Sequence, residues 1–341
     1  MWRAAHHGLR QLFGGRDPKN WHPLLAVYYL TYACDLRCPY CSDGQGRAYH
    51  ELRSKVLPGH GVIELLRRIR RYSDHLVITG GEPLLHKDVD DVLRRLPEVG
   101  FDGVVFTTNG KDALPHLDAL AAVDHLVFSL DTLDEEKADN FFGGGPGVLK
   151  QILKNLDAAL AQRPKKQEII ISAVATPDNL EDLHGLYDFA KARGLRFALC
   201  PQLVGVKAHP DLAESPAYVA IFERLIAERR AGGPVNGSVK YLEYMRDFRE
   251  FDCRPSAVLA ISPMGDIFYP CLELGNVAGN LLDEPDLQAI RAAGRNKFGP
   301  EPKCDNRCHS ACALGFSLAL ADPRSLADEA LFAARAKLAG R

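Results

Sequence analysis

Three cysteines near the N-terminus have the spacing of a loop that holds a metal cluster. Cys34, Cys38 and Cys41 are separated by three and then two residues. Thiolates are soft ligands that suit zinc and iron–sulfur clusters, and a closed site needs four of them. The next candidate ligand along the sequence is His50. A [4Fe–4S] cluster on these thiolates would leave one iron free for an outside ligand, and the alternative is a zinc site completed by a distant residue.

A second group of cysteines lies toward the C-terminus, and its members are Cys253, Cys271, Cys304, Cys308 and Cys312. The first two stand at the ends of a predicted hairpin, so they should lie close together, and the other three could complete the site. Five thiols are one too many for a single four-cysteine site, so the binding subset stays open. A structural zinc is the alternative. Cys200, which ends a predicted strand, is expected to be an ordinary buried thiol.

Six segments rich in β-branched or aromatic residues alternate with segments of helical periodicity, which predicts repeated βα units. The predicted strands are residues 24–31, 76–79, 104–108, 125–130, 168–175 and 196–200. The predicted helices include residues 62–72, 89–96, 148–160 and 180–192. Such units form a parallel sheet with right-handed crossovers, and six of them suit either an open doubly wound sheet or a partly closed barrel.

Polar and glycine-rich segments directly follow three of these strands. Gly-Gly-Glu-Pro at 80–83 follows the second strand, Thr-Thr-Asn-Gly at 107–110 ends the third, and Ser-Leu-Asp at 129–131 ends the fourth. Parallel strands all point one way, so these segments should line one rim together with the first cysteine group. Folds of this type bind their ligands at that rim.

After about residue 212 the strand and helix alternation stops. The predicted elements there are helices at 217–230 and 239–250, a hairpin of 257–261 and 266–269, and a last helix at 325–338. The hairpin turns at Met264 and Gly265, and a loop rich in Cys, Gly, Pro and Asn follows it. We place a soft boundary near 210–235, where glycines cluster.

Composition excludes several classes of protein. The chain has 341 residues, of which 46% are apolar and 25% charged, with a net charge of -2. These values exclude wholesale disorder and a global basic field for nucleic acid. No apolar run is long enough to span a bilayer and no signal-peptide core is visible, so we expect a cytoplasmic protein. Residues 1–16 form an amphipathic pattern that should pack on the protein itself, and the alternative is contact with a membrane surface.

The motifs taken together resemble those of the radical S-adenosylmethionine (SAM) superfamily over about residues 22–200. The cysteine loop has an aromatic residue, Tyr40, just before its last cysteine, and Gly-Gly-Glu-Pro follows the second strand. The resemblance implies a partial (β/α)6 barrel. It also implies a [4Fe–4S] cluster on Cys34, Cys38 and Cys41 whose open iron binds SAM. Reductive cleavage of SAM in that family gives a 5′-deoxyadenosyl radical, which takes a hydrogen atom from the substrate.

The same resemblance assigns roles to the residues along the rim. Tyr40 would lie beside the adenine of SAM. The turn would receive the methionine ammonium, and its residues are Gly80, Gly81, Glu82 and Pro83. Asn109, Ser129 and Asp131 would contact the ribose hydroxyls or the methionine carboxylate. The alternative for these three is strand-end capping and turn formation, for which Asn, Ser and Asp are common.

The C-terminal hairpin, with a cysteine at each end and a glycine at its turn, resembles the SPASM and shorter Twitch extensions of that superfamily. Gly265 precedes Cys271 by six positions, where the SPASM pattern has five. The cysteines are also too few for two fully thiolate-bound clusters. We therefore expect a Twitch-like, small α+β domain with one auxiliary [4Fe–4S] cluster. The expected organisation is an N-terminal segment 1–21, a barrel 22–212, a helical linker 213–252 and an auxiliary domain 253–341.

The resulting hypothesis is a radical SAM oxidoreductase or transferase that acts on a small metabolite or lipid-linked substrate. It would need an electron donor such as flavodoxin or ferredoxin and would bind no nucleic acid. A peptide or protein maturase is an alternative, weakened because only about twenty residues precede the barrel. An enzyme that rearranges GTP for molybdopterin is disfavoured because the chain ends Ala339-Gly340-Arg341 and not in Gly-Gly. A non-catalytic zinc-stabilised or electron-transfer protein is the alternative from another class.

Overall fold

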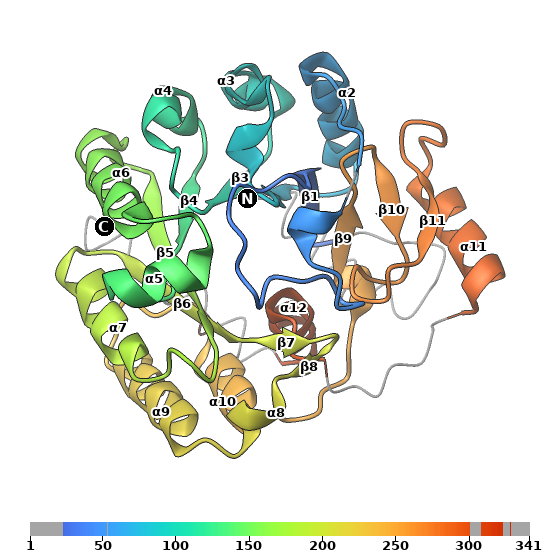
Figure 1. The fold of residues 1–341 in the computed structure, drawn as a ribbon. Coiled ribbons are helices and arrows are strands. Elements are labelled where there is room, and N and C mark those ends of the chain that lie inside the picture. Colours follow the sequence, from blue (N-terminus) through green and yellow to red (C-terminus); the bar gives the residue numbers. More distant parts are fainter. Residues whose placement is uncertain (1–22, 53, 301–307, 323–327, 329–341) are drawn as a thin grey trace.

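The computed structural model describes residues 23–52, 54–300, 308–322 and 328. Its centre is a nine-stranded sheet in the order β11-β10-β9-β1-β2-β3-β4-β5-β6 (Figure 1). The larger part is six parallel strands, β1 Leu25–Thr31, β2 His75–Gly80, β3 Gly103–Thr108, β4 His125–Ser129, β5 Glu168–Ala175 and β6 Arg196–Pro201. The six predicted strands are confirmed, with ends shifted by at most one residue.

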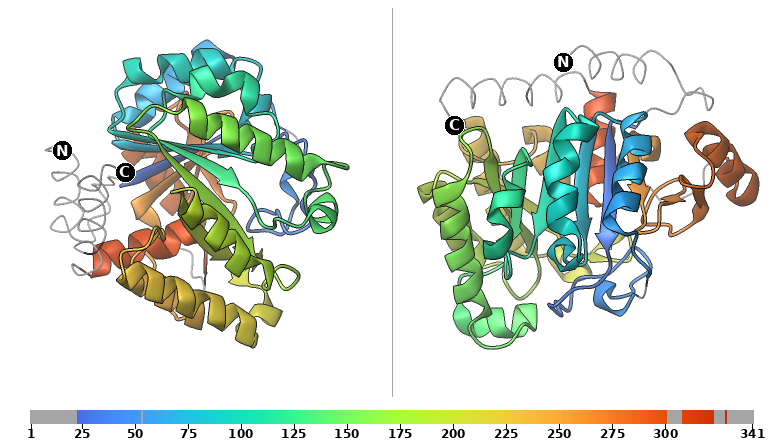
Figure 2. Two further views of the ribbon diagram at one scale, coloured as in Figure 1. Left: turned by 90° about the vertical axis from the view of Figure 1, so that its left-hand side faces the viewer. Right: turned by 90° about the horizontal axis from the view of Figure 1, so that it is seen from above.

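Helices between these strands cover the outer face of the curved sheet (Figures 1 and 2). They are α2 Gly59–Arg70, α3 Val89–Val99, α4 Leu117–Leu120, α5 Glu135–Phe142, α6 Val148–Gln162 and α7 Asp182–Ala192. The four predicted helices are confirmed, and the short α4 and α5 are additions. A doubly wound sheet would carry helices on both faces. The fold is therefore the partial barrel, with its helices outside.

Strand β1 shows how the sheet separates two apolar environments. It is buried along its whole length, as expected for a central strand of a parallel sheet. Tyr28 and Leu30 pack into the main core against the helices. Leu25, Val27 and Tyr29 point to the other face, where they form a smaller cluster inside the barrel. Successive residues of a strand face opposite sides, so β1 contributes to both the scaffold and the interior.

The C-terminal part extends the same sheet. Strand β9 Val258–Ile261 pairs in parallel with β1, and β10 Asp266–Phe268 pairs antiparallel with β9. This is the predicted hairpin. The division at 212 and 252 stays a prediction, since one sheet runs through both parts of the chain.

The loop expected after the hairpin is partly regular structure, which corrects the sequence prediction. It contains β11 Val277–Asn280, which pairs with β10, and α11 Leu287–Phe298. Small residues permit this packing: a Cβ at Gly279 would lie 3.4 Å from Ile290, and one at Gly294 would lie 2.8 Å from Tyr269. Glycine weakens a local strand or helix signal, so only tertiary contacts reveal these elements.

The remaining elements close the open side of the barrel. They are β7 Leu203–Val204, β8 Lys207–Ala208, α8 Pro210–Ala213, α9 Pro216–Arg230, α10 Val239–Asp247 and α12 Ala311–Ala321. Helix α12 lies across the opening (Figure 1), where it contacts α10 and β9, and its Phe316 joins the interior cluster. Apart from Asp328, the predicted helix at 325–338 lies outside the described residues, and so does the N-terminal pattern. Within the described ranges, no helix is long and apolar enough to cross a bilayer.

Candidate functional site

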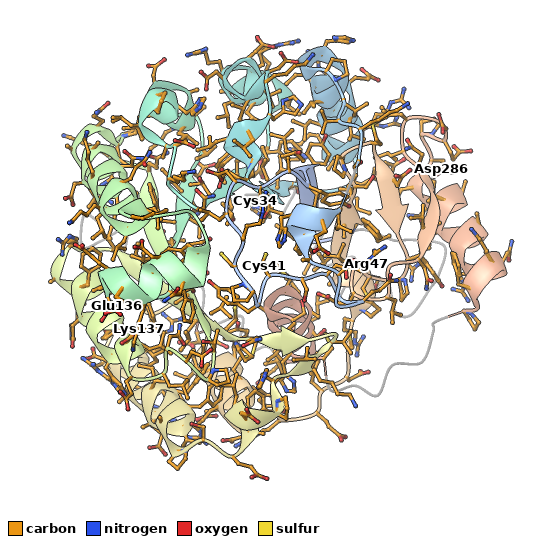
Figure 3. All side chains as sticks on the ribbon, in the orientation of Figure 1. Cys34, Cys41, Arg47, Glu136, Lys137 and Asp286 are labelled. Atoms are coloured by element: carbon orange, nitrogen blue, oxygen red, sulfur yellow. The ribbon has the colours of Figure 1, made fainter. Side chains whose placement is uncertain are left out.

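The first cysteine group lies on the loop that follows β1, at the carboxyl rim of the strands (Figure 3). The loop is fixed by its own backbone and by α5. Arg37 N–H donates to Phe142 O at 2.7 Å, and the Arg37 guanidinium donates to Cys34 O at 2.7 Å. Leu36 is buried and packs in the core. One apolar anchor and two hydrogen bonds therefore hold the middle of the loop while its thiols stay at the rim.

The loop offers three thiols, the donor type that iron–sulfur clusters take. Their burial opposes the thiolate form that a cluster needs. Burial, with the nearby Asp131 carboxylate, raises the pKa of the Cys38 thiol to about 12, and Cys41 and Cys34 add to the shift. In the part of the chain that is described, no three metal-binding side chains stand together as a finished site. A thiol changes direction by rotation about χ1 without backbone movement. Loading would release the thiol protons.

The Gly-Gly-Glu-Pro turn after β2 is packed tightly against the start of the cysteine loop. Gly81 N–H donates to Thr31 O at 2.8 Å, and Glu82 N–H donates to Ala33 O at 2.7 Å. A Cβ at Gly80 would lie 2.1 Å from Thr31 O, and one at Gly81 would lie 2.3 Å from Ala33 O. Both positions therefore require glycine, because the turn and the start of the cysteine loop approach each other so closely.

Glu82 is a buried acceptor that joins the ends of two strands. Its carboxylate accepts from Leu84 N–H at 3.0 Å, Thr108 Oγ1 at 2.9 Å and Asn109 N–H at 2.7 Å. The side chain is 1% exposed. Burial raises its pKa to about 7, although the three hydrogen bonds act in the opposite direction. Glu82 thus holds the ends of β2 and β3 together beneath the rim.

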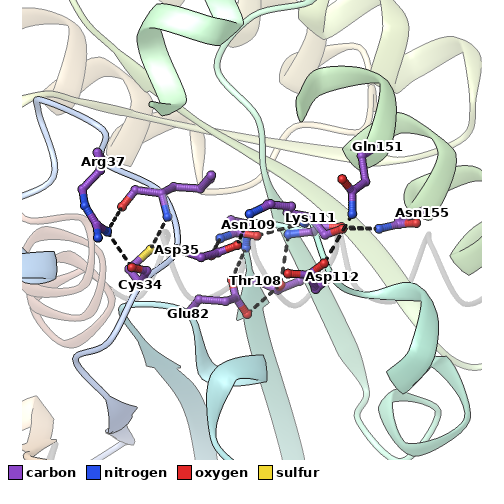
Figure 4. A network of polar contacts seen from close by, with 12 residues as sticks. Cys34, Asp35, Arg37, Glu82, Thr108, Asn109, Lys111, Asp112, Gln151 and Asn155 are labelled. Carbon is purple, nitrogen blue, oxygen red and sulfur yellow. Dashed lines mark hydrogen bonds and ion pairs between the residues drawn. The ribbon is translucent and has the colours of Figure 1, made fainter. Parts of the chain in front are cut away.

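Asn109 connects β3 to the cysteine loop (Figure 4). Its Nδ2 donates to Asp35 Oδ1 at 2.9 Å, while Lys111 Nζ forms an ion pair with Asp35 Oδ2 at 2.8 Å. The Asn109 Oδ1 accepts from Lys111 N–H at 2.9 Å. The sequence interpretation missed Asp35 and Lys111. The only sequence signal for Asp35 was its position between two candidate ligands.

Asp131 and Tyr40 form a buried pair across the rim. The Tyr40 hydroxyl donates to Asp131 Oδ2, and Val174 N–H donates to Asp131 Oδ1 at 2.7 Å. Asp131 is 4% exposed, and burial raises its pKa to about 6. Ser129 lies two residues before Asp131, opposite Ser172 of β5. Both predicted SAM contacts therefore lie on the rim, and Asp131 already has two protein donors.

Four of the second-group cysteines line one cavity of about 130 Å³. They are Cys253, Cys271, Cys308 and Cys312. Cys308 is 6% exposed, and burial, Glu273 and the nearby Cys271 and Cys253 raise its pKa to about 12. The structure therefore brings together thiols that are up to 59 positions apart in the sequence. Cys304 lies outside the described residues.

A second cavity, of about 390 Å³, lies between β5, β6 and α12. Cys200 and Cys312 both line it, with Ser172, Asn236 and Tyr241. Cys312 therefore borders both cavities, and Cys200 faces the interior of the barrel. The sequence interpretation treated Cys200 as an ordinary buried thiol, because strand position alone does not show which wall of a barrel a side chain joins.

Three tyrosines occupy the region between the two cysteine groups. The ring centroids of Tyr29 and Tyr49 are 5.8 Å apart and stacked, and Tyr32 lies 5.8 Å from Tyr29. Tyr49 N–H donates to Cys41 O at 3.3 Å, and Tyr29 lines the cavity of the second group. This aromatic cluster was not foreseen, because it joins residues from β1 and from the segment after Cys41.

Residues 28–190 match the family model described as the radical SAM superfamily. A GTP 3′,8-cyclase of Limosilactobacillus fermentum is 36% identical over 146 residues, which cover 42% of this chain and 43% of that protein. A PqqA peptide cyclase of Xanthomonas oryzae pv. oryzae is 27% identical over 170 residues, covering 49% and 44%. The chain thus spans about half the length of the first curated relatives, with 43% and 51% covered.

Solved structures share the fold over most of this chain. Streptococcus suis SuiB bound to the precursor peptide SuiA superposes with a TM-score of 0.62 at 23% identity, covering 85% of this chain and 68% of SuiB. The protein anSMEcpe with bound AdoMet gives a TM-score of 0.60 at 14% identity, covering 89% and 98%. At these identities the likeness concerns the fold, including its C-terminal extension.

Proposed function

The chain belongs to the radical SAM superfamily through its residues 28–190, and we propose that it is an enzyme that oxidises or forms a bond in a small substrate. The superfamily uses a [4Fe–4S] cluster and SAM, and needs a reductant. When bound, these cofactors supply reductive cleavage of SAM and removal of a hydrogen atom from the substrate. The observation that carries the proposal is the position of three thiols on one rim loop, directly against the Gly-Gly-Glu-Pro turn.

We assign the work of binding to separate groups of residues. Cys34, Cys38 and Cys41 would hold the cluster. The rim residues would hold SAM, and they are Tyr40, Gly80, Gly81, Glu82, Pro83, Asn109, Ser129 and Asp131. The buried Glu82 keeps the turn and β3 in register, and Asn109 keeps the cysteine loop beside them. These contacts would preset the rim before the cofactors bind.

The second cysteine group is proposed to hold an auxiliary [4Fe–4S] cluster. The support is the cavity that Cys253, Cys271, Cys308 and Cys312 share, with Cys304 as the further candidate. Most other described residues around this cavity are apolar, including Val27 and Val258. A dry, apolar surround is typical of protein sites that tune a buried cluster. The barrel 22–212 and the auxiliary region 253–341 would then act on one substrate between them.

The residues that line the interior cavity favour an uncharged substrate. Of its described lining residues, none is charged, and its polar groups are hydroxyl, amide and thiol groups such as those of Ser172, Asn236 and Cys200. A triphosphate taken into such a cavity would be desolvated without a countercharge, which is strongly unfavourable. This favours a small neutral metabolite, or the neutral end of a lipid-linked molecule, over GTP. Flavodoxin or ferredoxin would supply the electron.

A peptide substrate is the second candidate. The similarity to the PqqA peptide cyclase of Xanthomonas oryzae pv. oryzae favours it. The fold shared with SuiB, which was solved with its precursor peptide, is compatible with it. A peptide would have to enter the barrel from the carboxyl rim, where a cavity of about 610 Å³ is lined by Tyr40, Lys137 and His209 among others.

The test is anaerobic reconstitution of the full chain with iron and sulfide, followed by reduction in the presence of SAM. We expect a brown protein with about eight irons per chain and formation of 5′-deoxyadenosine, measured by mass spectrometry. Cys34→Ser serves as the inactive control. A colourless protein that leaves SAM intact would overturn the proposal. Addition of GTP should not increase 5′-deoxyadenosine formation. If it does, the proposal of a neutral substrate is wrong and the substrate is a nucleotide.

A further inference from the structure

The contact between Tyr40 and Asp131 joins the cysteine loop to the wall of the barrel. The Tyr40 hydroxyl donates to Asp131 Oδ2, and the partners are 91 positions apart in the sequence. Tyr40 lies between two candidate cluster ligands, Cys38 and Cys41. A hydrogen bond at this point therefore acts on the part of the loop that carries two of the three thiols.

Asp131 is itself held on several sides. Its second oxygen, Oδ1, accepts from Val174 N–H at 2.7 Å. Its backbone oxygen accepts from Asn179 Nδ2 at 3.0 Å, and the same amide group donates to Val174 O at 2.9 Å. Asp131 and Asn179 are 4% and 1% exposed. The carboxylate is thus a fixed point of the β4 and β5 strand ends and cannot follow the loop if the loop moves.

The other face of the Tyr40 ring meets α5. Its centroid lies 5.5 Å from that of Phe141, and the next residue of α5, Phe142, accepts from Arg37 N–H at 2.7 Å. Tyr40 and Phe141 together form part of the wall of the rim cavity of about 610 Å³. The ring is therefore fixed by a hydrogen bond at its tip and by an aromatic contact at its side.

We propose that Asp131 is a positioning residue, which sets the orientation of Tyr40 and the spacing of Cys38 and Cys41 before SAM binds. The inference rests on the proposed function, because it gives these residues a cluster and SAM to serve. It assigns Asp131 a different role from direct contact with SAM. Both of its oxygens already accept hydrogen bonds from protein donors, and Tyr40, the residue that it would orient, is the one proposed to lie beside SAM.

The test compares Tyr40→Phe, Asp131→Asn and the double variant with Asp124→Asn as the matched control. Asp124 stands at the opposite end of β4 and likewise accepts from a neighbouring strand, Val104 N–H at 2.9 Å. The first readout is the dissociation constant of SAM for the reconstituted full chain. Each single variant should weaken SAM binding about tenfold, as expected for loss of one hydrogen bond to a charged group. The double variant should be no weaker than Asp131→Asn, and Asp124→Asn should match the wild type.

A second readout does not depend on activity or on SAM. In the metal-free full chain, the rate at which iodoacetamide alkylates Cys38 and Cys41 is followed by mass spectrometry. Tyr40→Phe, which leaves the Asp131 charge in place, should raise this rate severalfold, whereas Cys200, outside the loop, should react at the wild-type rate in that variant. Asp131→Asn is left out of this readout because it also removes a negative charge that acts on all three thiols.

Three outcomes would overturn the inference. Additive effects in the double variant would show that the two residues act separately. Loss of SAM binding in Asp131→Asn with an unchanged Tyr40→Phe would make Asp131 a direct SAM contact. Unchanged alkylation of Cys38 and Cys41 in Tyr40→Phe would remove the positioning role even if SAM affinity falls. A wild-type chain that forms no 5′-deoxyadenosine overturns the proposed function instead, and the alkylation result then still decides whether Asp131 fixes the loop.

Discussion

The two cysteine regions are built in opposite ways. The first is a single short loop, and polar contacts from the ends of β2, β3 and β4 hold it in place, through Glu82, Asn109 and Asp131. The second gathers thiols from distant segments around a small cavity whose other walls are mainly apolar. The first region is therefore specified by hydrogen bonds at a rim, and the second by packing in an interior.

This difference bears on what each region can do. Hydrogen-bonded strand ends give a rigid, solvent-facing loop with one side open, as a site that receives an outside ligand requires. A cavity whose walls are mainly apolar instead limits the polar groups around its contents, and the polarity of such a surround affects redox potential and ligand pKa. We therefore expect the first region to bind and cleave SAM, and the second to act only when a substrate is present.

The largest expected effect separates the two regions by mutation. Cys34→Ser should lower 5′-deoxyadenosine formation on the order of 10³-fold, because it removes a proposed ligand of the cluster that cleaves SAM. Cys271→Ser should leave SAM cleavage within a few-fold of the wild type while it lowers the iron content from about eight to about four irons per chain. The measurement is 5′-deoxyadenosine and iron per chain, by mass spectrometry and metal analysis. Equal loss of SAM cleavage in both variants would contradict the division of labour.

The sequence predicted the first region well because its determinants are local. Parallel strands place their carboxyl ends on one rim, so the order of strands and motifs along the chain is enough to group Cys34, Glu82 and Asn109. The partners that complete the rim, Asp35 and Lys111, are ordinary charged residues without a motif. Their pairing depends on the distance between two loops, which no spacing along the chain encodes.

The second region was predicted only in outline. The hairpin was found from its alternation and its turn, but β11 and α11 were taken for loop because glycines dilute their local patterns. The position of Cys312 on the borders of two cavities depends on how α12 crosses the open side of the barrel. Such long-range packing sets which thiols face each other, so the binding subset could not be read from spacing.

Glu82 tests the claim that hydrogen bonds specify the first region. Glu82→Ala leaves the donors of Leu84, Thr108 and Asn109 buried without an acceptor, so the free energy of unfolding should fall by about 3 kcal/mol. Urea denaturation followed by circular dichroism measures this change. Glu98→Ala is the control, because Glu98 is exposed and its ion pair with Arg67 spans 3.8 Å, and it should change stability by less than about 0.5 kcal/mol. Equal losses of stability in Glu82→Ala and Glu98→Ala would mean that the hydrogen bonds of Glu82 do not stabilise the fold.

The pH dependence of stability should differ between Glu82 and Glu168, which lie at opposite ends of the barrel. Burial raises the pKa of Glu82 to about 7, above its unfolded value, so the folded chain binds this proton more tightly. Its stabilising contribution is complete below about pH 4.5 and is lost as the pH rises to 7, by roughly 3 kcal/mol. Glu168, at the opposite end of the sheet, has its pKa lowered to about 2 by hydrogen bonds from His125 and Arg196. Its contribution is instead lost as the pH falls below about 4.5.

The measurement is urea denaturation of the metal-free chain between pH 3 and pH 8. The free energy of unfolding of the wild type should fall relative to that of Glu82→Gln as the pH rises from about 4.5 to 7. The wild type should lose stability relative to Glu168→Gln only as the pH falls below about 4.5. Glu98→Gln should run parallel to the wild type throughout. If the wild type instead gains stability relative to Glu82→Gln toward pH 7, Glu82 is ionised in the folded chain.

The smallest expected effect concerns the joint between the two regions. Gly44, three residues after Cys41, lies against the backbone of Glu273, two residues after Cys271, and a Cβ there would stand 2.3 Å from Glu273 O. Gly44→Ala should therefore push the two segments apart and lower stability by about 1–2 kcal/mol. Gly185→Ala, with nothing within 4 Å on the exposed side of α7, should be neutral or slightly stabilising. Because the joint contacts both cysteine loops, Gly44→Ala should also raise alkylation of Cys41 and Cys271 together. A rise at Cys41 alone would show that the two regions, although adjacent, are mechanically independent.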